Sequence, residues 1–79
     1  MPTVFRSGPY RFFFYSNEGK EPMHVHVEAG DGYAKFWLNP VRLARSIGFK
    51  PHELGEIRTI IEASTDQIET KWNEHFRNA

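Results

Sequence analysis

The sequence predicts an α+β fold in which an antiparallel sheet comes first and helices follow it. Two observations lead to this prediction. Residues 3–38 contain short runs of β-branched and aromatic residues separated by Gly and Pro turns, whereas residues 51–76 carry apolar residues at helical spacing. We therefore expect an antiparallel sheet of three to four strands with two C-terminal helices packed on one face, in a single domain spanning residues 1–79.

The first two strands are separated by a turn with a clear signature. Residues 3–6 form the first predicted strand, and Ser7-Gly8-Pro9 forms the turn after it. Residues 10–15, Tyr-Arg-Phe-Phe-Phe-Tyr, have high β propensity. Their run of three Phe residues lacks alternation and predicts a strand that is apolar on both faces. Asn17-Glu18-Gly19-Lys20 then predicts a turn, and Pro22 marks the start of the third strand.

Residues 23–28, Met-His-Val-His-Val-Glu, are the most informative segment of the chain. Apolar and polar residues alternate there with the period of a half-buried strand. One side of this strand is apolar and faces the core, and the other side carries His24, His26 and Glu28. Three side chains that transfer protons or bind metals are therefore expected on one exposed surface of the sheet.

The next hairpin has a predictable register. Asp31-Gly32 is a favoured two-residue type I′ turn, and it pairs Glu28 with Lys35 and His26 with Trp37. A shift of one residue would mix the two faces, which favours this register. One predicted face holds His24, His26, Glu28, Lys35, Trp37 and Asn39, and the other holds Val25, Val27, Ala34, Phe36 and Leu38.

The C-terminal half begins with an ambiguous segment. Asn39-Pro40 ends the preceding strand, and residues 41–47 are compatible with a further strand or with a helical turn, of which we favour a short strand. Pro51 suits the first turn of a helix. That helix carries Leu54, Ile57, Ile60 and Ile61 at helical spacing, and a second one carries Ile68, Trp72 and Phe76. Ser64 and Gln67 fit a capping box between them, so the break is either a turn or a kink.

The composition narrows the class of protein. The formal net charge is zero, which argues against non-specific nucleic-acid binding. There is no cysteine, no apolar run near the length of a membrane span and no signal-peptide pattern, so we expect a cytoplasmic protein that is not membrane-bound. The aromatic content of 15% favours a protein partner or self-association as a homo-oligomer.

Four segments carry a family resemblance: residues 21–28, Glu-Pro-Met-His-Val-His-Val-Glu, and residues 10–19, 34–38 and 72–76. Together they resemble the domain of unknown function numbered 4160, a family of small bacterial proteins, over nearly the whole chain. Met23 stands where many relatives have proline. The resemblance implies one component of a type II toxin–antitoxin-like pair. It also implies a small antitoxin-like partner protein that is encoded in the same two-component operon and resembles the domain of unknown function numbered 2442. The expected exposure of His24 and His26 favours the toxin role, and the antitoxin role remains open.

Three interpretations of the histidines remain open. In a metal-independent ribonuclease or hydrolase, His24 and His26 act as base and acid and Lys35 provides the cation for the phosphate, with Arg11 and Tyr15 close by. Trp37 and Phe13 would stack a base, and Glu28 completes the expected binding residues Arg11, Tyr15, Glu28 and Trp37. In a non-enzymatic protein-binding module, the histidines stack on aromatic neighbours or form the docking face. In a metal site, Glu28 is the nearest third ligand, but it lies about 13 Å from His24 along a regular strand. We therefore expect neither a metal nor another cofactor, and the sequence leaves open whether the chain is an enzyme.

Overall fold

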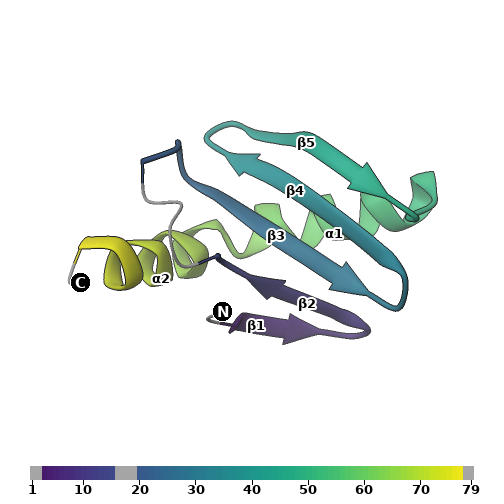
Figure 1. The fold of residues 1–79 in the computed structure, drawn as a ribbon, viewed down its shortest axis with the longest axis horizontal. Helices are drawn as coiled ribbons and strands as arrows, with labels where there is room; N and C mark the ends of the chain where they lie inside the picture. Colours follow the sequence, from purple (N-terminus) through teal and green to yellow (C-terminus); the bar gives the residue numbers. More distant parts are fainter. Residues whose placement is uncertain (1–2, 16–19, 78–79) are drawn as a thin grey trace.

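The computed structural model describes residues 3–15 and 20–77, and it shows one sheet with both helices on the same side (Figure 1). The strands are β1 (Thr3–Ser7), β2 (Tyr10–Phe13), β3 (His24–Ala29), β4 (Gly32–Leu38) and β5 (Val41–Ile47), and the helices are α1 (Pro51–Ala63) and α2 (Thr65–Arg77). All neighbouring strands are antiparallel, and their order in the sheet follows the chain. The α+β class is confirmed.

The sheet has five strands, so the prediction of three to four is wrong in number. The uncertain segment at residues 41–47 is a full strand, β5, which forms one edge of the sheet. All of its residues except Val41 are exposed, so the alternation of apolar and polar residues that identifies a half-buried strand is missing there. The turn predicted at residues 17–20 falls largely outside the described residues.

The hairpin between β3 and β4 has a different turn from the predicted one. Ala29 pairs with Gly32, so the two-residue loop is Gly30-Asp31 and not Asp31-Gly32. Gly30 has φ 56° and Asp31 has a negative φ, which fits a type II′ turn with glycine in its first position. The predicted type I′ turn is therefore wrong.

The register consequently differs from the predicted one by two residues. Glu28 lies opposite Tyr33 instead of Lys35, and His26 lies opposite Lys35 instead of Trp37. Because side chains alternate with a period of two, an even shift leaves each of them on its predicted face. The predicted pairs are wrong, and the predicted separation of the faces is confirmed.

The main core lies between the sheet and the helices. It includes the five predicted residues of the apolar face, together with residues from both helices: Val25, Val27, Ala34, Phe36, Leu38, Ile57, Ile61, Ile68 and Trp72. Phe12 and Phe14 also belong to this core, whereas Phe13 is buried on the opposite face. The prediction that this Phe run is apolar on both faces is confirmed.

The break between the helices is real, since α1 ends at Ala63 and α2 begins at Thr65. The Thr65 hydroxyl donates to the Ile61 carbonyl at 3.0 Å across this junction. The sheet is tied to α1 by Tyr10, whose hydroxyl donates to a Glu56 carboxylate oxygen at 2.8 Å. Burial, and after it this bond to Glu56, raises the pKa of Tyr10 to about 12. Neither helix, in the part of the chain described, is long and apolar enough to span a membrane.

We predict opposite effects on stability for two Gly→Ala substitutions. A Cβ at Gly32 would overlap the Phe49 ring, so Gly32→Ala should lower the free energy of unfolding by about 1–3 kcal/mol. A Cβ at Gly55, inside α1, meets nothing within 4 Å, so Gly55→Ala should raise it by about 1 kcal/mol. Urea unfolding followed by circular dichroism measures both changes, and a neutral Gly32→Ala would contradict the packing of Phe49 on β4.

Candidate functional site

The structure brings all the sequence-predicted site residues together on the open face, which we define as the face of the sheet that points away from α1 and α2. Three register pairs organise them: Arg11 with Glu28, His26 with Lys35, and His24 with Trp37. Tyr15 follows β2, and its ring centroid lies 4.5 Å from that of His26. The members of the group are His24, His26, Lys35, Arg11, Tyr15, Glu28 and Trp37.

Both histidines of the open face are buried. The exposed fraction is 0% for His24 and 2% for His26. Neither helix covers this face of the sheet in Figure 1, but the Trp72 ring of α2 reaches His24. The expectation that the two imidazoles are exposed is therefore wrong.

An aromatic layer encloses the histidines, and we call it the histidine cluster. It consists of Phe13, Tyr15, His24, His26, Tyr33, Trp37 and Trp72. The His26 ring stacks between the rings of Phe13 and Tyr33, with centroids 5.4 Å and 5.8 Å from its own. His24 makes edge contacts with His26 at 5.0 Å and with Trp72 of α2 at 5.1 Å. Trp72 also belongs to the main core, so it joins the two layers at the end of the sheet where β3 begins.

Each imidazole is held by a hydrogen bond at Nδ1. The Nδ1 of His24 lies 2.8 Å from the Pro22 carbonyl oxygen. A carbonyl oxygen only accepts, so this nitrogen must carry the proton and donate. The Nδ1 of His26 lies 2.7 Å from the Tyr33 hydroxyl, and either group is able to donate there. These bonds compensate part of the cost of burying polar rings.

Charged side chains surround the cluster, and we call them the charged rim: Arg11, Glu21, Glu28 and Lys35. Arg11 pairs with Glu28 at 2.7 Å, and Lys35 pairs with Glu21 at 2.9 Å. The predicted pair between Glu28 and Lys35 is wrong, because the register differs by two residues. The cations also cover rings: the Arg11 guanidinium lies 4.5 Å from the centre of the Phe13 ring, and the Lys35 ammonium lies 4.5 Å from that of Trp37.

Sequence reasoning missed three residues of this site. Tyr33 shares its face with Lys35 and Trp37, so the alternation of β4 would have assigned it to the cluster. Glu21 precedes β3, and nothing local in the sequence indicates its pair with Lys35. Trp72 was expected in the core alone, and its contact with His24 depends on how α2 packs against the sheet.

The arrangement favours contact over catalysis. Within residues 3–15 and 20–77, no three His, Asp or Glu side chains are grouped so that they would hold a metal ion. His24 and His26 lie close enough to share acid–base work, but the two residues are 98–100% buried. A partner would instead meet the charged rim and the outer edges of Tyr15 and Trp37.

The fold and the site define a small α+β domain with a five-stranded sheet whose open face is built over two buried histidines. The chain belongs to the family described as Domain of unknown function (DUF4160), whose model matches residues 10–73. The matched segment contains every member of the histidine cluster. A search of curated proteins and a search of solved structures found no match.

We predict that the buried histidines contribute to stability. His26→Ala removes a ring that stacks on Phe13 and leaves the Tyr33 hydroxyl without this partner, so the free energy of unfolding should fall by about 2–4 kcal/mol. His24→Ala should have a similar effect. His52→Ala is the control, because His52 is exposed in the first turn of α1, and it should change stability by less than about 0.5 kcal/mol.

Urea unfolding of the three variants measures these differences. Equal stability of His26→Ala and His52→Ala would contradict a structural role for the histidine cluster.

Proposed function

We propose that this chain is one component, the toxin, of a bacterial type II toxin–antitoxin-like pair, that it acts by protein–protein contact, and that it binds a small cognate partner protein. The membership in such a pair rests on the resemblance carried by residues 21–28 and the three other segments. The contact mechanism rests on a single structural observation, the burial of His24 and His26 beneath the side chains of the open face.

The groups that a partner would meet support binding over chemistry. Arg11 and Lys35 are each held in an ion pair and placed over a ring, so they are fixed in position before any partner arrives. A surface with charged side chains already held in place loses less conformational entropy when it binds. Tyr15 and Trp37 add aromatic area, which is enriched at protein interfaces.

Metal-independent RNA cleavage is the competing function, and one observation favours it. The ring centroids of His24 and His26 lie 5.0 Å apart, and Lys35 lies opposite His26 across the hairpin. Cleavage would need one imidazole to reach the ribose 2′-hydroxyl, and that requires the aromatic layer to open. Stacking of a base on Phe13 or Trp37 would also require displacement of the cation that covers each ring.

We predict that inducing this chain alone in bacteria arrests growth. Co-expression with the product of the adjacent reading frame should restore growth, and the two proteins should elute together in size-exclusion chromatography. Normal growth with the chain alone, together with arrest by the adjacent product alone, would assign the antitoxin role to this chain. Absence of a complex would contradict the proposed function.

Total RNA isolated during the arrest separates contact from catalysis. The contact mechanism predicts intact RNA. Catalysis predicts that RNA is lost with the wild type and with His52→Gln, but stays intact with a His26→Gln variant that circular dichroism shows to be folded. Such a result would identify His26 as a catalytic residue and contradict the contact mechanism.

A further inference from the structure

The outer edge of β5 is open for pairing. β5 is last in the sheet order, and no further strand pairs with it among the described residues. Both helices lie on one face of the sheet (Figure 1), and at the start of β5 the Arg58 guanidinium of α1 donates to the Val41 carbonyl at 3.2 Å. The strand also carries exposed apolar side chains, since Leu43 is 40% exposed and Ile47 is 50% exposed. An open edge of this length is a template for the addition of another strand.

An irregularity in β5 places its two arginines on the same face. Arg45 lies opposite Lys35, but Phe36 lies opposite Leu43, so Ala44 is an extra residue in the ladder. Without this bulge, residues 42 and 45 would point to opposite faces, because alternate residues of a strand do so. With it, Arg42 lies opposite Trp37, and both arginines belong to the open face.

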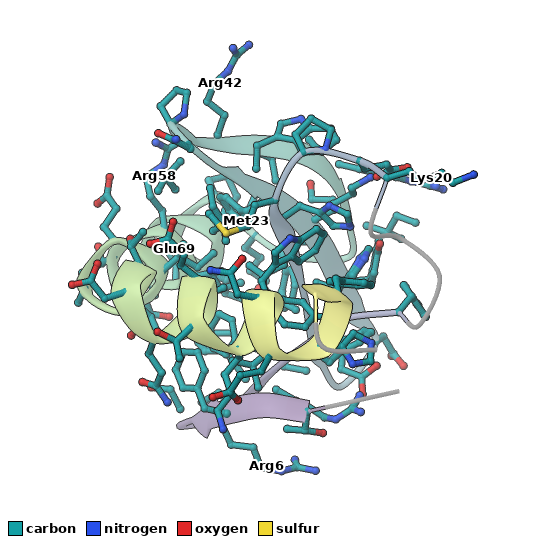
Figure 2. The ribbon with its side chains drawn as sticks, turned by 90° about the vertical axis from the view of Figure 1, so that its left-hand side faces the viewer. Arg6, Lys20, Met23, Arg42, Arg58 and Glu69 are labelled. Atoms are coloured by element: carbon teal, nitrogen blue, oxygen red, sulfur yellow. The ribbon has the colours of Figure 1, made fainter. Side chains whose placement is uncertain are left out.

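These arginines are not neutralised within the described chain. Lys35 is paired with Glu21, whereas no ion pair joins Arg42 or Arg45 to a described residue. Arg45 and Lys35, like charges in directly opposite positions, disfavour the β4–β5 pairing. In Figure 2, Arg42 extends away from the body of the molecule at one edge of the sheet, and Arg6 does so at the other.

The charges select the kind of strand that β5 would accept. A second copy in antiparallel pairing, centred between Leu43 and Ala44, would set the arginines of one copy against those of the other, which disfavours self-pairing in that register. An incoming strand with acidic side chains on the open face would neutralise both arginines. Its apolar side chains on the helix side would cover Leu43, whose neighbour Phe36 belongs to the main core.

We propose that β5 is the docking edge for an extended acidic segment of the partner protein, which adds to the sheet as a sixth strand. This proposal rests on the proposed function and adds a contact at the edge of the sheet to the contacts that the partner would make with the open face. A nucleic acid would also be attracted to the arginines, but β5 contains no aromatic residue on which a base would stack, and a cation covers Trp37 beside it. A protein strand uses both the backbone edge and the charges, so it accounts for more of what β5 presents.

A synthetic peptide that alternates Glu and Val, with a Lys–Val peptide as its counterpart, tests the edge directly. Titration into the isotope-labelled chain, followed by amide chemical shifts, should show that only the Glu–Val peptide shifts the signals of Val41–Ile47.

Arg42→Glu/Arg45→Glu should weaken this binding by about ten-fold or more, since each lost charge pair is replaced by repulsion. Arg6→Glu/Lys20→Glu is the matched control, because both side chains are exposed, lie away from β5 and change the net charge equally. Its affinity should stay within about two-fold of the wild type.

Three results would overturn the proposal: no shifts in β5, equal weakening by both double variants, or stronger shifts in β5 with a single-stranded RNA oligonucleotide than with the Glu–Val peptide.

Failure of this inference is distinguishable from failure of the proposed function. A complex with the adjacent gene product that leaves the β5 amides unprotected from hydrogen exchange would reject the docking edge and keep the pair. Binding of the Glu–Val peptide to β5 without any complex with the adjacent gene product would keep the docking edge and reject the pair.

Discussion

Two imidazoles buried on the side of the sheet that faces away from the helices are the constraint on which the rest of this structure depends. A buried polar ring is costly unless its nitrogens are hydrogen-bonded, and here a backbone carbonyl and the Tyr33 hydroxyl serve the two Nδ1 atoms. Rings from β2, β4 and α2 then enclose the pair. A chain of 79 residues has a thin core, and this layer buries Phe13, His24 and His26 on the second face of the sheet.

The same layer decides which groups are available for function. The two imidazoles, which are able to do acid–base chemistry, lie inside the aromatic layer, and the charged side chains lie outside it. The net charge of zero conceals a separation of charge, because the helices carry six of the ten acidic residues while five of the ten basic residues lie on the strands: Arg6, Arg11, Lys35, Arg42 and Arg45. Arg11 and Lys35 are neutralised in the charged rim, so the unpaired cations of β5 dominate one edge of the sheet. The docking edge proposed for β5 follows from this distribution of charge.

Much of the fold follows from local patterns, and the errors have physical causes. The two faces of β3 and β4 were predictable because a period of two survives a shift of two residues. The turn was not, since Gly30-Asp31 and Asp31-Gly32 both have glycine where a two-residue turn requires it. The position of Gly32 inside β4 depends on the Phe49 ring that packs against it, which is a contact distant in the sequence. The site residues were predictable from alternation, but the burial of His24 was not, because it involves Trp72 from α2. β5 carried no alternation because it is exposed on both faces.

Accessibility of the histidines to diethyl pyrocarbonate tests the central claim most directly. Brief treatment of the folded protein, followed by peptide mass spectrometry, compares the buried pair with His52, which is exposed in the same chain. Our account predicts rapid modification of His52 and modification of His24 and His26 only after unfolding in urea. Modification of His24 or His26 in the folded protein at the rate of His52 would contradict it, because the open face would then present imidazoles to substrates.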